Sequence, residues 1–466
     1  MSRVQQVHRG HVFHVAGAPS LADAASSLVS IPDGALVVDE AGVVAWCGRF
    51  ADLPDALRTA DVRDHRPGFL LPGFVDTHVH FPQTFSYDAY GGEQLLEWLD
   101  RCIFPAEARL RDPEFAELAA GAFCDRRIAA GTTSAMVFGS AFPDAQDALF
   151  RETRRRGLRI VSGRGIQTDG PEAASALVTS EDDALALTRD EIDRWHAVDT
   201  GDPATARLQV AVVPRFALSV TSRTLRGLGE LYDDVRGRGV YFHTHLSEND
   251  RPGTGEIAQT TQKFGCRRYL DAYDGRFLPD SALGGASLLG RRSIFAHAVH
   301  CSDGELARLA ATGSSIAHCP TSQQFLGSGT MPWRRTARSG VTIAIGTDVG
   351  GGDEWLIPQV LADAYKVHMS EPAAVALHPA QLLFSGTLAG ARALDQESRI
   401  GNFDVGKDAD FVVVDPSRWP PLDAALDYGI RSSDAELARD QTLFTLLTAM
   451  REPAIAEVYV AGSLVA

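Results

Sequence analysis

The stretch GFLLPGFVDTHVH, residues 68–80, joins an apolar run to two histidines that are separated by one residue. The apolar run predicts a strand that is buried on both faces. Alternate residues of a strand point to the same side, so His78 and His80 direct two imidazoles toward one point. Such a pair can chelate a metal, although two histidines alone are more often hydrogen-bonded or surface side chains. A metal site at this strand end therefore requires ligands from other strands.

From Leu71 onward, short apolar runs alternate with longer amphipathic stretches, which is typical of a parallel sheet wound with helices. The eight apolar runs are residues 73–80, 132–139, 159–165, 208–216, 239–248, 293–300, 314–320 and 341–350. Eight strands with helical connections predict an α/β fold, the (β/α)8 TIM barrel, whose functional site is built where the strands end.

The two ends of the chain have a different pattern. Residues 34–50, GALVVDEAGVVAWCGRF, contain two β-rich runs joined by a turn, and residues 406–415 and 455–465 are also β-rich. We expect these strands to form one small β-sandwich domain, made of residues 1–70 and 400–466. The barrel is expected to occupy residues 71–399.

The composition excludes several classes of function. The chain has 466 residues, 45% of them hydrophobic and 22% charged, and its apolar stretches are too short to span a bilayer. Its net charge of −16 disfavours a nucleic-acid partner, because phosphate backbones are bound by clusters of Lys and Arg. The first residues have no apolar core of the length that a secretion signal needs, so we expect a cytoplasmic protein. The six cysteines have no C-x-x-C spacing and are expected to be reduced packing residues.

Three further ionisable residues lie at the ends of predicted strands. His245 ends the fifth run, His297 lies in the sixth, and Asp348 follows the eighth. Each of them alone could be a buried, hydrogen-bonded residue, but four imidazoles and a carboxylate at the same rim of one barrel indicate a metal site.

The residue types in this predicted site narrow the choice of metal. Nitrogen and carboxylate ligands without a thiolate suit Zn2+, with Fe2+ or Mn2+ as alternatives. Two-metal barrel hydrolases usually bridge their ions with a modified lysine on a middle strand, and residues 81–241 contain no lysine. One metal ion is therefore favoured, although a carboxylate could also bridge two.

Glu248 lies three residues after His245. This offset lets a carboxylate reach over a metal without binding it, where it could take a proton from water and give it to a substrate. The alternative for an isolated glutamate in this position is a helix cap or a solvated side chain.

The strings LPGFVDTHVHFPQT, LLEWLDRCIFPAE, VVPRFALS, THLSEN, AHCPTSQQFLGSG and GTDVGGG, between residues 71 and 352, together resemble the amidohydrolase superfamily. Within it, the chain looks most similar to the guanine deaminase branch. The H-x-H and GTD elements mark the superfamily, whereas LLEWL with FPAE, the Pro-Arg-Phe at residues 214–216 and HCPTS with GSG mark the branch.

The resemblance implies zinc-dependent hydrolysis of guanine to xanthine and ammonia. It implies that one zinc ion is held by His78, His80, His245 and Asp348. Glu248 and Asp348 would transfer protons, and His297 would hydrogen-bond the attacking oxygen. The residues that it implies for purine binding are Gln83, Trp98, Arg215 and Phe216, with His318 and Cys319 shaping the wall. It also implies a homodimer acting on a small purine.

The physical properties of the purine-binding candidates agree with this assignment. Arg215 offers a fork of donors suited to the O6 and N7 acceptors of guanine, while Trp98 and Phe216 offer ring faces. The alternative for Arg215 is a structural ion pair.

Three departures from the branch keep other substrates open. Asp353-Glu354-Trp355 stand where hydroxyl residues are common, Gln323 stands where Asn is usual, and residues 165–173, GIQTDGPEA, replace a differently spelled loop. The alternatives are deamination of another aminated heterocycle (8-oxoguanine, a pterin or an aminotriazine), amide hydrolysis, and a non-catalytic binding protein.

Overall fold

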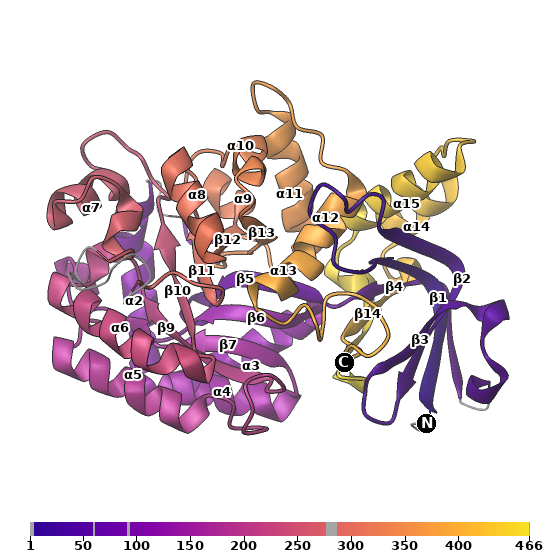
Figure 1. Ribbon diagram of the computed structural model, residues 1–466, viewed down its shortest axis with the longest axis horizontal. Coiled ribbons are helices and arrows are strands. Elements are labelled where there is room, and N and C mark those ends of the chain that lie inside the picture. The colour runs from indigo at the N-terminus through magenta and orange to yellow at the C-terminus, as the bar shows by residue number, and fades with distance from the viewer. Residues whose placement is uncertain (1–3, 59–60, 91–93, 276–286, 466) are drawn as a thin grey trace. The chain divides into compact units, whose positions relative to one another are not determined.

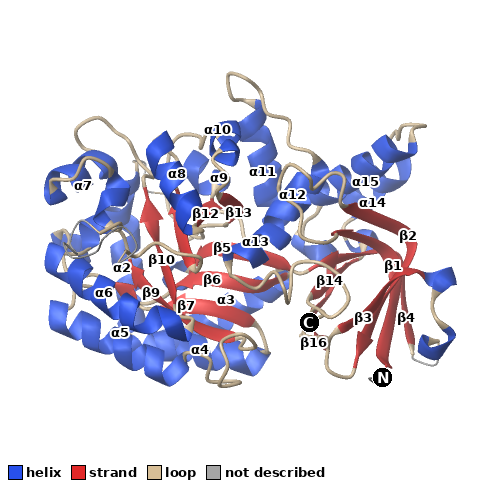
Figure 2. Cartoon of the chain, in the orientation of Figure 1, coloured by secondary structure: helices blue, strands red, loops and turns tan. Residues whose placement is uncertain are grey.

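The computed structural model describes residues 4–58, 61–90, 94–275 and 287–465 (Figures 1 and 2). The chain divides into two compact units. One contains residues 77–124 and 135–354, and the other contains residues 1–76, 125–134 and 355–466. The predicted boundaries, 1–70 with 400–466 and 71–399, stay a prediction.

Eight strands form the barrel that the apolar runs predict. They are β5 (Phe74–His80), β6 (Thr132–Phe138), β7 (Arg159–Gly163) continued by β8 (Gly165–Ile166), β9 (Leu208–Pro214), β10 (Tyr241–Leu246), β11 (Ser293–His297), β12 (Ser315–His318) and β13 (Thr342–Ile345). They are hydrogen-bonded in the order β5-β6-β7-β9-β10-β11-β12-β13, and the register from β9 to β13 is parallel. The predicted (β/α)8 fold is confirmed.

The barrel is nearly closed by contacts between its first and last strands. The amide of Asp348, just after β13, donates to the carbonyl of His78 at 2.8 Å, and the amide of His80 donates to the carbonyl of Val349 at 2.8 Å. These bonds join the carboxyl ends of β5 and β13, so residues that follow the two strands lie next to each other.

Helices connect the barrel strands and lie around them (Figure 2). They are α1 (Leu95–Trp98), which continues through a π-helical turn (Leu99–Ile103) into α2 (Phe104–Ala108), then α3 (Pro113–Ala129), α4 (Pro143–Arg156), α5 (Glu181–Trp195), α6 (Ser222–Val235), α7 (Glu256–Phe264), α8 (Asp303–Thr312), α9 (Pro320–Phe325) and α10 (Trp333–Arg338). Local caps define several of their starts. Before α8, for example, Ser302 and Glu305 form a capping box that satisfies two backbone amides.

Strands from both ends of the chain form a second, mixed sheet. They are β1 (Val4–Val15), β2 (Leu28–Asp39), β3 (Val44–Arg49), β4 (Val62–Pro72), β14 (Phe411–Val414), β15 (Ile455–Val460) and β16 (Ser463–Leu464). Their order is β16-β15-β14-β4-β1-β2-β3, so the carboxyl-terminal strand β14 pairs with β4. The predicted terminal β-domain is confirmed, and its seven strands are hydrogen-bonded into one sheet rather than two.

Five helices after residue 355 belong to the same unit as the terminal sheet. They are α11 (Ile357–Met369), α12 (Pro379–Gly386), α13 (Leu388–Ala393), α14 (Pro420–Tyr428) and α15 (Ala435–Ala449). Across the described ranges, no helix combines the length and apolar character needed to cross a membrane. The six cysteines are free thiols.

Candidate active site

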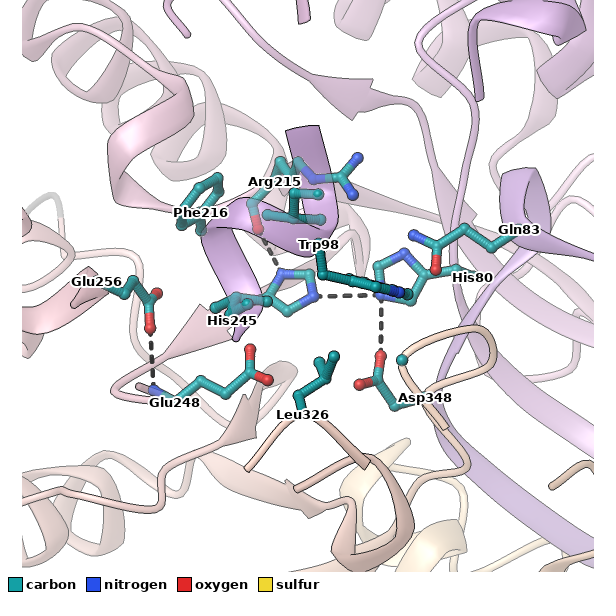
Figure 3. Close-up of a pocket in the computed structure, with 13 residues that line it drawn as sticks. His80, Gln83, Trp98, Arg215, Phe216, His245, Glu248, Glu256, Leu326 and Asp348 are labelled. Atoms are coloured by element: carbon teal, nitrogen blue, oxygen red, sulfur yellow. Dashed lines mark hydrogen bonds and ion pairs between the residues drawn. The ribbon is translucent and has the colours of Figure 1, made fainter. Parts of the chain in front are cut away.

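Four side chains bring their ligand atoms within 4.8 Å of one another: His78 and His80 on β5, His245 on β10, and Asp348 after β13. The Nε2 atoms of His78 and His80 are 3.1 Å apart, and His80 Nε2 is 3.2 Å from His245 Nε2. Asp348 Oδ1 lies 3.0 Å from His78 Nε2 and 3.1 Å from His80 Nε2. Figure 3 shows His80, His245 and Asp348 converging at one side of a pocket.

Hydrogen bonds behind two of these imidazoles determine which nitrogen carries the proton. His245 Nδ1 lies 2.5 Å from the carbonyl of Arg215, so it donates and leaves the Nε2 lone pair free. His243 Nδ1 donates to the carbonyl of Ile294 at 2.9 Å, and its Nε2 accepts from His78 Nδ1 at 2.7 Å. His78 and His245 therefore each carry a lone pair, not a proton, on Nε2.

This arrangement fits a divalent metal ion. Ligands that share one zinc ion at about 2.0–2.1 Å lie roughly 3 Å from one another, which agrees with the spacing of the four donors. Burial lowers the pKa of His78 and of His245, so both imidazoles stay neutral, as metal ligands must be. Without a cation, lone pairs and a carboxylate would face one another in a buried space at a considerable cost in free energy.

His243 was not among the predicted site residues. It holds the proton of His78 on Nδ1, which is the supporting role that partners of metal-bound histidines commonly play. The sequence contains a signal for it, because residues 243–245, HTH, repeat the H-x-H spacing of the first strand. Spacing alone gives no indication of which of the two histidines faces the metal site and which one supports it.

Glu248 and His297 lie on the other side of Asp348. His297 Nε2 is 3.4 Å from Glu248 Oε2 and 3.9 Å from Asp348 Oδ2, and the three residues form a second buried group. Asp348 thus turns Oδ1 toward the histidine ligands and Oδ2 toward His297. Burial lowers the pKa of His297 to about 3, so this imidazole is neutral at physiological pH.

The two carboxyl groups have opposite tendencies. Burial, with the nearby charges of Asp348 and Glu256, raises the pKa of Glu248 well above its usual value. Burial alone would also raise the pKa of Asp348, but its close contacts with His78 and His80 hold this pKa well below its usual value. The pocket therefore contains one carboxyl group that tends to keep a proton and one that tends to lose it.

The loops that carry these groups have strained backbones. Ser247, His297, Ala298 and Asp348 have φ values of 49°, 72°, 52° and 51°, a region that residues other than glycine rarely adopt. All four follow or end a barrel strand, where such strain commonly accompanies a functional site. Gly351 allows the loop to approach, because a Cβ atom there would lie 2.8 Å from Asp348 Oδ2.

A pocket adjoins the metal-ligating groups (Figure 3). It is lined by His80, Gln83, Leu95, Trp98, Leu99, Arg215, Phe216, His245, Glu248, Glu256, Leu326, Asp348 and Gly351. Trp98, Leu99 and Phe216 belong to one apolar cluster with Leu95 and Leu326. A flat ring system suits such apolar walls.

Arg215 forms a buried ion pair in this pocket. Its Nη1 donates to Glu107 Oε2 at 2.6 Å, and Gln83 Nε2 donates to Glu107 Oε1 at 2.8 Å. Arg215 therefore forms an ion pair and also lines the pocket. Glu107, in the FPAE motif on α2, was not predicted to have a role.

Several sequence-based candidates lie outside the residues that line the pocket. His318, at the end of β12, is buried with its ring 5.8 Å from that of Trp333. Gln323 is buried on α9, and Asp353 is exposed. None of these three residues is among the described residues that line the pocket.

Comparison with known proteins places this site in a family. Residues 69–465 match the Amidohydrolase family. The chain is 37% identical to a probable guanine deaminase of Deinococcus radiodurans, over 99% of this chain and 98% of that one, and 34% identical to guanine deaminase of Escherichia coli, over 95% and 93%. The solved structure of E. coli guanine deaminase matches with a TM-score of 0.85 at 31% identity, over 100% of this chain and 99% of that one. The chain therefore belongs to the amidohydrolase family and is a metal-dependent aminohydrolase similar to guanine deaminases.

Proposed function

We propose that this protein hydrolyses guanine to xanthine and ammonia with one bound zinc ion. The observation that carries the proposal is the pocket itself. It is lined by metal-ligating groups with Glu248, by the polar side chains of Arg215 and Gln83, and by the aromatic side chains of Trp98 and Phe216. The similarity to guanine deaminases over nearly the whole chain supports guanine as the substrate.

His78, His80, His245 and Asp348 would hold the metal. A zinc ion in such a site acts as a Lewis acid that makes water a nucleophile near neutral pH. Iron or manganese would suit the same ligands, so zinc is part of the proposal. Metal analysis of the purified protein should find one ion per chain.

The protein's own groups would move the protons. Asp348 turns its Oδ2 away from the histidine ligands, and its lowered pKa keeps it ionised, so this oxygen can accept a proton from the attacking water. Glu248 has a raised pKa and lines the pocket, so it is suited to give a proton to a ring nitrogen beside C2. The proton that Asp348 takes from water would then pass to the departing amine, and the added hydroxyl group would return a proton to Glu248. His297 is neutral and would hydrogen-bond the oxygen that is added to C2.

The purine would lie between Trp98 and Phe216. Arg215 and Gln83 would donate to the O6 and N7 acceptors of guanine, which turns C2 toward Glu248 and the metal-ligating groups. Replacing the C2 amino group by the oxygen of water yields xanthine and ammonia.

The test is ammonia release from a panel of heterocycles by protein of known metal content. Guanine should have the highest kcat/KM and should yield xanthine. A higher kcat/KM with 8-oxoguanine, a pterin or an aminotriazine would mean that the protein is a deaminase whose preferred substrate is that compound. An acid or amine product without ammonia would indicate amide hydrolysis instead, and metal-containing protein that releases no ammonia from any of these compounds would indicate a binding protein. The homodimer stays a prediction.

A further inference from the structure

Glu107 lies at the centre of a buried group of polar residues. It is 4% exposed and Arg215 is 3% exposed, so their ion pair is almost completely removed from water. Its two carboxylate oxygens have different partners. Oε2 accepts from Arg215 Nη1 and Oε1 accepts from Gln83 Nε2. One carboxylate therefore anchors both polar side chains of this part of the pocket wall.

The amide of Gln83 is held from both ends. Its Oε1 accepts from the backbone amide of Gly350 at 2.9 Å, and its Nε2 donates to Glu107. A flipped amide would set its oxygen against the carboxylate and its NH2 group against a backbone donor, so the orientation is determined by its neighbours. Gln83 Nε2 has a second N–H, and Gln83 lines the pocket.

Arg215 is held in a similar way. A guanidinium carries only donors and stays charged, so Glu107 supplies the charge that compensates it in a buried position. The guanidinium carbon also lies 5.2 Å from the centre of the Phe104 ring and 5.5 Å from that of Phe138. One of its five N–H groups is directed to Glu107, and the side chain lines the pocket, where Figure 3 shows it on the same side as Gln83.

We infer that Glu107 is a specificity-determining positioning residue. By accepting from both Arg215 and Gln83, it holds them so that this wall offers donors to the ring and no acceptor. Such a wall favours a ring whose facing edge has two acceptors, as the O6 and N7 atoms of a 6-oxopurine do, over a 6-aminopurine, whose NH2 group would face donors. The inference rests on the proposed function for the orientation of the ring.

The test compares guanine with 2,6-diaminopurine, which has the same amino group at C2 and differs at position 6. In the wild-type protein, kcat/KM should be much higher for guanine. In Glu107→Gln, which has nearly the same shape, Arg215 and Gln83 lose their common anchor. The ratio of the two kcat/KM values should then fall by roughly ten- to 150-fold, the range expected for hydrogen bonds that involve a charged group.

Glu191→Gln is the matched control. Glu191 is another buried glutamate of the barrel unit, which accepts from the backbone amide of Arg164 at 3.0 Å and is not one of the residues that line the pocket. Its loss can reduce stability and both kcat/KM values together, but it should leave their ratio unchanged. Glu107→Asp keeps the charge and should keep most of the discrimination. An unchanged ratio in Glu107→Gln, or equal loss of the ratio in both variants of Glu107, would overturn the inference.

A binding experiment separates this inference from the proposed function. Calorimetry in the Glu248→Gln background should find that guanine binds more tightly than 2,6-diaminopurine, and that adding Glu107→Gln removes most of the difference. If the wild-type protein releases no ammonia from guanine, the proposed function fails while this binding preference still tests Glu107. If guanine is deaminated but Glu107→Gln does not change the binding preference, the proposed function stands and the inference fails.

Discussion

Glu248 and Asp348 are two carboxyl groups that line one pocket but have different surroundings. Glu248 is buried near two other carboxylates, which favours its protonated form. Asp348 contacts two histidines through Oδ1, which favours its ionised form. Two titratable groups whose pKa values are displaced in opposite directions can act as a general acid and a general base.

Replacing Glu248 by Gln should lower kcat by about 10²-fold or more, because a positioned general acid/base contributes about 10²–10⁴-fold. The amide has nearly the same shape and can still accept from Ser328 Oγ, which lies 3.3 Å from Glu248 Oε1. Metal content should therefore be unchanged, and it is measured beside kcat on the same preparation. Near-normal turnover with a full complement of metal would refute the proton-transfer role.

Among the elements, β13 and β5 must approach each other closely to complete the site. Gly346 follows β13, and a Cβ atom at this position would lie 2.8 Å from the Cβ atom of His78 and 3.0 Å from Cys319 Sγ. Its amide donates to the carbonyl of His318 at 3.0 Å. The glycine thus gives the first strand the space that places His78 beside Asp348.

Gly346→Ala should displace β5 at His78 and weaken the metal site. Overpacking of this kind typically costs about 1–3 kcal/mol, and misplacing a ligand can lower metal affinity by roughly 10–100-fold. The measurements are the thermal midpoint and metal retention during dialysis against a weak chelator. Gly121→Ala is the control, because a Cβ atom there meets nothing within 4 Å. Equal metal retention in the two variants would contradict this explanation.

Strand β1 carries buried histidines in the terminal sheet. His8 is 1% exposed, its ring stacks on that of His65 at 5.3 Å, and it meets the Phe411 ring edge-on at 4.8 Å. Burial and the charges of His65 and Arg63 lower the pKa of His8 to about 3. His8 therefore stays neutral in the folded protein under conditions in which the unfolded chain would be protonated.

This shift predicts that acid destabilises the terminal sheet. The unfolded chain binds a proton at His8 below about pH 6.5 and the folded protein does not, so the stabilisation is present above that pH and is lost as the pH falls toward 3. The slope per histidine approaches about 1.4 kcal/mol for each pH unit. His8→Phe keeps an aromatic ring and cannot be protonated. Its free energy of unfolding, measured with urea from pH 7 to pH 5, should fall less steeply than that of the wild-type protein.

The pH range above 7 provides the control for His8→Phe. There the side chain is neutral in both states, so the two proteins should differ by a constant amount. Parallel curves down to pH 5 would mean that His8 does not contribute to acid sensitivity.

At the scale of the whole molecule, the metal-ligating residues connect distant parts of the chain. They come from the first, fifth and eighth barrel strands, and a metal held by all of them would act as a crosslink between β5, β10 and the end of β13. Any ligand that binds only the folded state stabilises it, by about 4 kcal/mol when it is present at roughly a thousand times its dissociation constant.

Removing the metal with a chelator should therefore lower the thermal midpoint by several degrees, and adding zinc should restore it. The variant His245→Gln lacks one ligand and should respond much less to either treatment. Identical midpoints for stripped and metal-loaded wild-type protein would show that the four residues do not hold a stabilising ion.

Much of this molecule could be predicted from its sequence by itself. Apolar runs of strand length with helical spacers determine a parallel barrel, because each run must be buried on both faces. The strand period places His78 and His80 on one side, and the barrel brings strand ends together, so His245 and Asp348 could be predicted as their partners. These properties depend on local periodicity and on one topology, both of which can be read along the chain.

Only the tertiary structure determined which side chains are hydrogen-bonded to one another and which charges compensate one another. Glu107 had no distinguishing signal in FPAE, yet it anchors Arg215 and Gln83. His243 has the H-x-H spacing of a ligand pair but supports His78. His318 follows an apolar run, as the ligands do, but lies outside the pocket lining. The reason is physical, since hydrogen-bond partners and charge compensation depend on the directions of side chains from residues far apart in sequence, and periodicity carries no information about those directions.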